Sequence, residues 1–366
     1  MQHRRGPATV TGSLLHPAPL GNREGGWRPE ARRPLRSRHH NNPRGRVRWR
    51  DGPPEVRPFR ARLRPPGDGL FRLPQRLLRP LLLLLLAAGA CRPAPAASAG
   101  VRIADDAGDT IAVAIPARRV VSLIPATTEI LFAIGAGGQL AGRTKWCDYP
   151  AEASRVPDVG DGMNPNLEAV VAARPDLVVL YRSGQNAGAA KRLRALGIPA
   201  IQVRSDALAD VPRLARLLGR LTGHERGADS VAQTFERELA AATVKPPANP
   251  PGVFILVWDE PPMTVGAGSY LSELLARAGA RNVFGDLPAS SGQISVEAAA
   301  TRDPDFVFTS NPLVPAFASR PEWQAVRAVR ERRFLHGTGS EFSRPSPRAP
   351  AAIRRLAAEL AAQEPR

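Results

Sequence analysis

The stretch that decides the fold is LEAVVAARPDLVVL at residues 167–180. A second copy, VEAAATRDPDFVFT, occupies residues 296–309. In each copy a Glu, at position 168 or 297, is followed seven residues later by Pro and eight residues later by Asp, and then by an apolar run. The copies lie 129 positions apart, which is about the size of one domain and far longer than a solenoid repeat. The repeat therefore predicts two similar α/β lobes that each display one Glu at an equivalent place.

Each copy indicates a short helix followed by a buried strand. Asn164 or Asn166 can cap the first helix and Ser295 the second, while the Pro-Asp pair is typical of a turn between helix and strand. Other apolar runs that alternate with helical patterns indicate a parallel sheet covered on both faces. The strands are expected at residues 120–124, 177–181, 200–203 and 253–258, and the helices begin near Pro125, Ala189 and Ala351.

One long helix is expected between the copies. Apolar residues recur there at steps of four from residue 222 to 245, and four prolines between 246 and 251 end the pattern. The fold class is therefore α/β: two Rossmann-like lobes, residues 118–221 and 250–366, joined by one long rigid helix at 222–246. Clefts between such domains, outside the strand ends, are the usual ligand sites, so we expect the ligand cleft between the lobes.

The amino-terminal part differs in composition from the rest. The formal charge is +18, and residues 1–80, with 19 Arg, no Lys and five acidic residues, hold +14 of it. Such a Pro- and Arg-rich leader, taken as residues 1–71, cannot bury enough apolar surface to fold. One interpretation is a nucleic-acid-binding arm. The other, disorder or a start codon assigned too far upstream, is favoured because an export signal follows the leader. We therefore expect no nucleic-acid partner.

Residues 72–91 are typical of an export signal. A flank with three Arg precedes a Leu-rich core that is too short to span a bilayer comfortably. Small residues directly before Cys91 resemble a bacterial lipoprotein box, in which the cysteine takes up a lipid. An ordinary signal peptide cut near Ala90 or Ala97, or an uncleaved anchor, is the alternative. We expect an exported protein, periplasmic or at the cell surface, anchored through Cys91, with residues 92–117 as tether and lead-in.

Signatures of catalysis are mostly missing from the sequence. Only His224 and His336 follow the leader, which excludes a multi-His zinc or manganese site. The sequence contains neither a Gly-x-Ser-x-Gly nucleophile elbow nor a Gly-x4-Gly-Lys phosphate loop. Cys147 has no partner if Cys91 is lipidated, and we interpret it as a small buried hydrophobe rather than a nucleophile. We expect neither an enzyme nor a resident cofactor or metal.

Aromatic residues make up only 5% of the chain, so those near strand ends are candidate ligand contacts. Trp146 and Tyr149 fall in an expected loop, and Tyr181 ends a strand. Such side chains either stack on a flat ligand or are partly buried under the loop. Residues 258–263 follow the first strand of the second lobe in the same way. Arg344, in a loop before the last helix, either holds an anionic group of the ligand or is solvated.

Glu168 and Glu297 have two interpretations. A single Glu in the first turn of a helix commonly faces water and is favoured there by the helix dipole. Two of them at matched positions of two lobes suggest instead a docking pair for a two-fold partner that presents Arg, since carboxylates accept Arg in bidentate fashion.

Together, these motifs resemble the substrate-binding proteins of ABC importers for cobalamin, haem and iron–siderophores, the class whose lobes are joined by a helical backbone. The resemblance covers about residues 118–362. It is carried by SLIPATTE at 122–129, CDYP at 147–150, both Glu-x6-Pro-Asp copies and SPR at 346–348, in the order expected of that family.

Within this class, the resemblance is greatest to members that bind cobalamin. It implies that Glu168 and Glu297 form salt bridges with Arg on the two subunits of the permease. The family's ligand-facing aromatics fall on Trp146 and Tyr181, its cleft Phe on Met263 and its ligand-contacting Arg on Arg344. At two positions where that family has a Trp lining the cleft, this chain has Gly162 and a residue at about Ser291. The resemblance therefore predicts fewer aromatic side chains along the cleft, and a thinner aromatic wall.

The resemblance therefore implies a monomeric receptor that captures a corrinoid, most simply cobalamin, and delivers it to the transmembrane dimer of an ABC permease. A haem or ferric-siderophore receptor of the same class is the alternative. A chelatase-like enzyme of two α/β lobes that binds a tetrapyrrole is a competing class.

Overall fold

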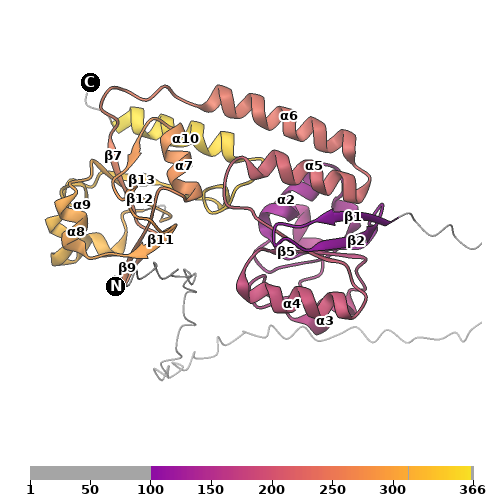
Figure 1. Cartoon of the computed structure of the whole chain (residues 1–366). Helices are drawn as coiled ribbons and strands as arrows, with labels where there is room; N and C mark the ends of the chain where they lie inside the picture. The colour runs from indigo at the N-terminus through magenta and orange to yellow at the C-terminus, as the bar shows by residue number, and fades with distance from the viewer. Residues whose placement is uncertain (1–99, 312, 364–366) are drawn as a thin grey trace, which may run out of the picture. The chain divides into compact units, whose positions relative to one another are not determined.

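The computed structural model describes residues 100–311 and 313–363. The leader, the export signal with Cys91, and the tether up to residue 99 lie outside the described residues. The described residues belong to one compact unit, in which two α/β lobes are joined by helices (Figure 1). Within them, no helix combines the length and the apolar character that a membrane crossing needs.

The first lobe is built on a four-stranded parallel sheet with the strand order β4-β3-β5-β6. Its side chains alternate between two apolar layers: Val120, Leu177 and Val179 face one layer, whereas Val121 and Val178 face the other. The strands are β3 (Val120–Ser122), β4 (Leu140–Arg143), β5 (Leu177–Tyr181) and β6 (Ala200–Val203). The helices are α2 (Pro125–Ala133), α3 (Leu167–Ala172), α4 (Gly184–Ala195) and α5 (Asp210–Thr222), with short 3-10 turns η1 (Gly137–Gln139) and η2 (Ala151–Arg155).

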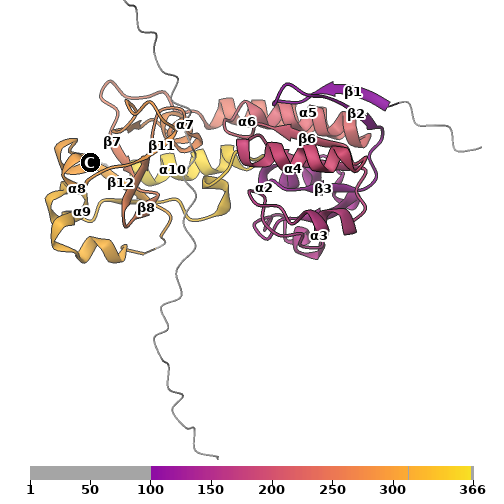
Figure 2. The same ribbon diagram turned by 60° about the horizontal axis from the view of Figure 1, so that its bottom comes forward.

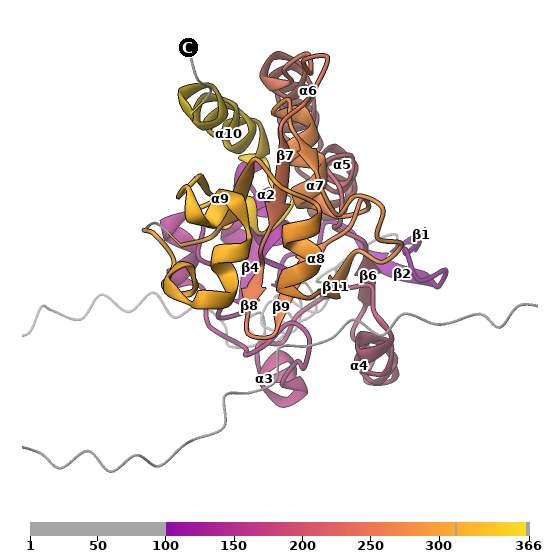
Figure 3. The ribbon, with the colours of Figure 1, turned by 90° about the vertical axis from the view of Figure 1, so that its left-hand side faces the viewer.

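The second lobe repeats this topology. Its parallel sheet has the order β10-β7-β12-β13, so the first strand again lies second in the sheet. The strands are β7 (Gly252–Ile255), β10 (Arg281–Asn282), β12 (Phe306–Thr309) and β13 (Phe334–His336). The helical segments are α7 (Tyr270–Arg277), α8 (Val296–Thr301), η3 (Ala316–Ser319), η4 (Pro321–Ala325), α9 (Arg327–Arg330), η5 (Ser340–Phe342) and α10 (Ala349–Gln363). Figure 3, seen from the side of this lobe, shows α8 and α9 in front. The prediction of two α/β lobes is confirmed.

The two sequence copies perform the same structural task. In each, a six-residue helix, α3 or α8, is followed two positions after its end by a residue with a left-handed backbone, Arg174 (φ 47°) or Asp303 (φ 39°). The Asp of the motif then accepts from the beginning of the neighbouring strand: Asp176 accepts the N–H groups of Arg118 and Arg119, just before β3, at 2.7 and 2.9 Å, and Asp305 accepts that of Gly252 in β7 at 2.7 Å. The Pro-Asp pair thus fastens the start of β5 or β12 beside the first strand of its sheet.

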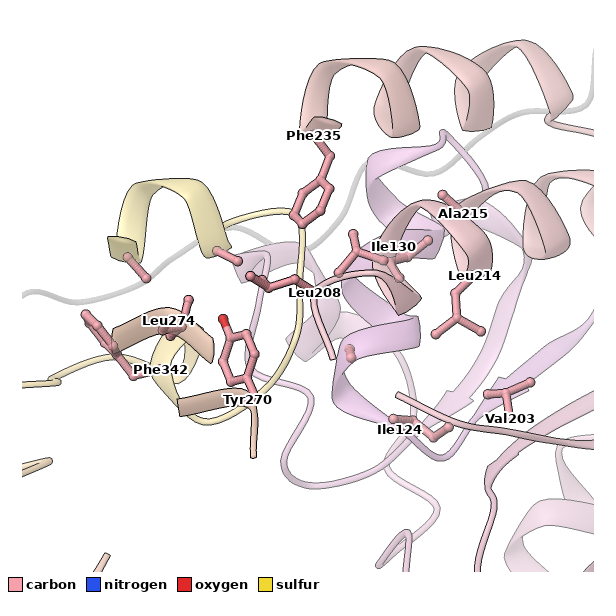
Figure 4. Close-up of a cluster of buried hydrophobic side chains, with 14 of the residues drawn as sticks. Ile124, Ile130, Val203, Leu208, Leu214, Ala215, Phe235, Tyr270, Leu274 and Phe342 are labelled. Atoms are coloured by element: carbon pink, nitrogen blue, oxygen red, sulfur yellow. The ribbon is translucent and has the colours of Figure 1, made fainter. Parts of the chain in front are cut away.

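The connection between the lobes is wider than a single helix. The linking helix α6 (Glu225–Ala242) is continuous, but α5 packs along it and α10 packs against its second half (Figures 1 and 2). One apolar cluster runs from Leu214 of α5 through Leu208 and Phe235 to Tyr270 and Leu274 of α7 (Figure 4). The lobes therefore share a hydrophobic core in addition to the helix that joins them.

Two elements were not expected from the sequence. Residues 100–114, expected to belong to the tether and lead-in, form the hairpin β1 (Gly100–Ala104) and β2 (Thr110–Ala114), and its buried Ile103, Ile111 and Val113 join the shared core. In the second lobe, β8 (Trp258–Asp259), β9 (Pro262–Val265) and β11 (Ser291–Gln293) form a small antiparallel sheet, where one strand was expected to run through to residue 258.

Candidate ligand cleft and docking glutamates

Three adjoining hollows form a cleft at the carboxyl ends of the parallel strands. The first-lobe hollow, of about 290 Å³, borders β3 and β5, and the second-lobe hollow, of about 460 Å³, borders β7, β12 and β13. The middle hollow, of about 450 Å³, lies between them; it shares Ile124, Pro125 and Trp146 with the first-lobe hollow and Ser343 with the second-lobe hollow. This is the place at which open α/β sheets receive ligands.

Trp146 is the most exposed aromatic side chain of the first-lobe hollow, with 58% of its surface accessible. Its indole N–H donates to Asp161 at 3.3 Å, and the Lys145 ammonium lies 4.9 Å from the ring centre and 3.7 Å from the Asp161 carboxylate. The N–H of Met163 donates to Asp161 at 2.8 Å, and this bond, with the one from Trp146 and the positive charge of Lys145, holds the pKa of Asp161 below its usual range. The Trp146 ring is thus oriented and still open to a ligand.

Tyr181 and Gly162 line the same first-lobe hollow as Trp146. The Tyr181 hydroxyl donates to Asp206 at 2.6 Å, and burial together with the Asp206 carboxylate raises the pKa of Tyr181. A Cβ at Gly162 would lie 2.2 Å from the carbonyl oxygen of Leu123, so position 162 has no room for a side chain. The Leu123 backbone therefore prevents an aromatic side chain at position 162, where the resemblance predicts a thinner wall.

The second-lobe hollow is predominantly apolar. Its lining includes Leu256, Val265, Tyr270, Phe308 and Phe342. The Tyr270 hydroxyl donates to the carbonyl of Glu341 at 2.7 Å, and burial raises its pKa.

Two of the remaining candidates lie outside the three hollows. Met263 lies in β9, paired with Trp258 on one side and Gln293 on the other, and it is not among the described residues that line them. Tyr149 borders a separate hollow with Phe132 and Pro347, and its ring is covered by the Arg348 guanidinium at 4.0 Å. The structure thus brings Trp146 and Tyr181 together at the cleft, without Tyr149.

Arg344 reaches the cleft as part of a cluster of ion pairs. It lines the middle hollow, but its Nε donates to Glu129 at 2.7 Å and its Nη2 to Asp148. Arg348 binds the same Glu129 in bidentate fashion at 2.7 and 2.8 Å, and it also donates to Glu341 at 2.6 Å. Arg344 is therefore largely paired, rather than solvated as one interpretation had it. We call Glu129, Asp148, Glu341, Arg344 and Arg348 the interlobe cluster.

The charge states in the interlobe cluster follow from this pairing. Burial disfavours the charged form of Arg348, but the Glu129 and Glu341 carboxylates outweigh that effect and raise its pKa. At Asp148, burial is likewise outweighed by Arg344, which lowers the carboxyl pKa. Sequence reasoning missed Glu129 and Arg348, although a Glu followed directly by the apolar residues Ile130 and Leu131 was a signal for a buried, paired carboxylate.

The loop that carries Trp146 is anchored beneath by Cys147. This cysteine is buried, as expected, and its sulfur lies 3.1 Å from the Thr128 hydroxyl and 3.2 Å from that of Thr144. Cys147 is thus packed as a small buried side chain. Among the described residues, no group of three or more His, Cys, Asp or Glu side chains is placed to hold a metal ion.

Glu168 and Glu297 occupy equivalent, exposed positions in the first turns of α3 and α8. Their helices are capped alike: Asn166 accepts the N–H of Ala169 at 3.2 Å, and Ser295 that of Ala298 at 3.1 Å. The Glu297 backbone N–H and the Ser295 hydroxyl lower the pKa of Glu297. Neither carboxylate forms an ion pair with another described residue, so both are available to a partner.

Comparisons with known proteins identify relatives of the chain. Residues 120–340 match the family described as periplasmic binding protein. A vitamin B12-binding protein of Pectobacterium atrosepticum is 30% identical over 258 residues, covering 69% of this chain and 91% of that protein. An uncharacterised ABC transporter substrate-binding lipoprotein of Bacillus subtilis is 29% identical over 272 residues, covering 71% and 85%.

The fold is also that of a solved structure. A periplasmic haem-binding protein of Roseiflexus sp. RS-1 in apo form aligns with a TM-score of 0.59 at 23% identity, covering 66% of this chain and 97% of that one. The likeness at this identity concerns the fold.

Proposed function

This chain belongs to the periplasmic binding protein family, as a substrate-binding protein of the ABC-importer class for vitamin B12, haem or siderophores, and on that premise we propose that its own ligand is a corrinoid such as cobalamin. The observation that carries the proposal is the chemistry of the cleft. The cleft combines an oriented, exposed indole with a broad apolar hollow. Among the described residues that line it, the cations Lys145 and Arg344 are already paired with carboxylates.

The pairing of these cations favours a ligand without strong negative charge. Haem carries two propionates, and many ferric siderophores are anionic, so each calls for free cations in its site. Arg344 would have to leave Glu129 to serve such groups, and breaking that buried pair is costly, whereas the exposed pair of Lys145 with Asp161 adds only a small cost. A corrinoid presents mainly neutral amides around a flat macrocycle, which suits stacking, shape and a few polar contacts.

The tyrosines of the cleft also favour a corrinoid over haem. Receptors and enzymes commonly hold haem iron through His, Cys, Met or Tyr, and an ionised phenolate is the form that Tyr uses. Tyr181 and Tyr270 donate their hydroxyl protons to Asp206 and to the Glu341 carbonyl, and both pKa values are raised. In cobalamin the axial positions of the cobalt are filled by the molecule's own nucleotide base and its upper ligand, so the protein need not supply a ligand.

The proposal is tested by calorimetric titration of the protein with cyanocobalamin, haemin and a strongly anionic ferric catecholate siderophore under one set of conditions. We expect saturable one-to-one binding of cyanocobalamin, and much weaker binding of the other two. Saturable binding of haemin or the siderophore with no heat from cyanocobalamin would overturn the corrinoid assignment while leaving the family membership intact.

The proposal extends to the partner and the location. Glu168 and Glu297 are exposed at equivalent sites and form no ion pair within the part of the chain that the structure describes, which supports docking to Arg on the two subunits of a permease. In this role the protein is a receptor and not an enzyme. The lipoprotein relative supports export and anchoring, with Cys91 as the proposed lipid attachment site.

A further inference from the structure

Every residue of the exposed first-lobe loop 146–149 is held by a specific contact. The Trp146 indole donates to Asp161, and the Cys147 sulfur contacts Thr128 and Thr144 within the first lobe. Three further contacts come from the second lobe. The Arg344 Nη1 donates to the Trp146 carbonyl at 3.2 Å and its Nη2 to the Asp148 carboxylate, while the Arg348 guanidinium covers the Tyr149 ring at 4.0 Å.

Both arginines are themselves fixed by one buried group. Glu129 in α2 is 3% exposed, and its two oxygens accept from Arg344 Nε and from Arg348 Nε and Nη2 at 2.7–2.8 Å. Arg348 also donates to the Ser340 hydroxyl at 2.9 Å and to Glu341. Planar guanidinium groups held in this way have little freedom, so the parts of the loop that they touch are held as well.

From this geometry we infer that Arg344 and Arg348, held in place by Glu129, are positioning residues that preset the Trp146 loop of the opposite lobe for ligand capture. The inference rests on the proposed function, in which Trp146 faces the ligand. One lobe thereby determines the shape of the other lobe's wall before ligand arrives. If the loop already has its binding conformation in the free protein, no affinity is lost to rearranging it. If that conformation is present only part of the time, the affinity falls by that fraction.

This role predicts a kinetic signature. If Glu129→Gln leaves the competent loop arrangement populated about a tenth of the time, the association rate for cyanocobalamin falls about tenfold and Kd rises by the same factor. The dissociation rate stays within about twofold, because the ligand in the bound state still makes its own contacts. Loss of a direct ligand contact acts the other way, chiefly through faster dissociation.

The test combines stopped-flow binding of cyanocobalamin with fluorine NMR of protein labelled with 5-fluorotryptophan. We expect one Trp146 resonance in the wild type, assigned with Trp146→Phe, and a shifted or split one in Glu129→Gln. Trp323, buried in a separate cluster of the second lobe, reports whether that lobe stays folded. Glu236→Gln is the matched control, because Glu236 pairs with Arg216 at 3.0 Å inside the first lobe and linking helix.

Arg348→Lys and Arg344→Gln keep the inference testable if Glu129→Gln does not fold, because both arginines are partly exposed. Unchanged Trp146 resonances and association rates in folded variants would overturn it, as would a faster dissociation rate alone. If the wild type binds no cyanocobalamin, the proposed function fails, whereas the Trp146 resonances still decide whether the cluster positions the loop.

Discussion

Gly162 shows how a single residue limits the ligand wall. Its missing side chain leaves room for the Leu123 carbonyl, which occupies the direction that a Cβ would take. We expect Gly162→Ala to lower the free energy of unfolding by about 1–3 kcal/mol, the usual cost of overpacking. Urea denaturation followed by circular dichroism measures this change.

Gly188→Ala is the matched control for that variant. Gly188 lies within α4, and nothing stands within 4 Å of the Cβ that alanine would add. Since alanine is the better helix former, this variant should gain about 0.5–1 kcal/mol. Equal effects of the two substitutions would contradict the role given to the Leu123 carbonyl.

Trp146 is expected to contribute to binding and little to stability. Because more than half of its surface is exposed, Trp146→Ala should leave the unfolding free energy within about 0.5 kcal/mol of the wild type. Loss of stacking should weaken cyanocobalamin binding about tenfold, mainly through faster dissociation. Trp146→Phe keeps a flat ring and should retain most of the affinity; if it binds as poorly as the alanine variant, stacking is not the contact that matters.

For single residues, the sequence predicted the location of some side chains, whereas for others it gave only the residue type and not the contacts. It indicated Trp146, Tyr181 and the buried Cys147 correctly as to location, because strand ends and small apolar residues have local signatures. It did not place Tyr149 outside the cleft or connect Glu129 with Arg344 and Arg348. Those contacts join residues more than 190 positions apart, and local pattern carries no information about such pairs.

Among the elements, the repeated helix–strand unit depends on its Asp. Asp176 accepts two backbone N–H groups ahead of β3, and Asp176→Ala would replace these charge-assisted bonds by bonds to water. We expect the unfolding free energy to fall by about 1–3 kcal/mol. In Asp229→Ala, which removes an exposed carboxylate 3.9 Å from Arg216, the change should stay below about 0.5 kcal/mol. A loss in Asp176→Ala no larger than in this control would contradict the fastening role.

Element boundaries were predictable where the apolar runs are short and fully buried. Strands β5 and β6 match the predicted ranges, and α6 is only a few residues shorter than expected at each end. The hairpin β1–β2 was missed, although Val101, Ile103, Ile111 and Val113 alternate with other residues around a turn that contains Gly108. Because the segment follows directly on the expected tether, its alternating apolar residues were assigned to the tether and lead-in rather than to the core.

For the whole molecule, the paired glutamates predict a separation between docking and binding. In the double variant Glu168→Lys and Glu297→Lys, the carboxylates become cations that repel the Arg expected on the permease. We expect uptake of labelled cobalamin into cells to fall more than tenfold, with the Kd of the purified protein changed less than twofold.

The control for this variant reverses two other exposed glutamates near helix starts, Glu152 in η2 and Glu322 in η4, one in each lobe. Uptake by this control should match the wild type. Normal uptake by the variant of Glu168 and Glu297 would exclude them as the docking pair.

The shared core between the lobes has a consequence for how the protein unfolds. The duplicated topology suggests two halves that were once autonomous, but Leu208, Phe235 and Tyr270 belong to one apolar cluster that neither half encloses alone. A chain cut after α6 would therefore expose part of that cluster on each fragment, and the fragments should need each other in order to fold. Melting of the intact protein should accordingly be one cooperative transition, in which both lobes are lost together.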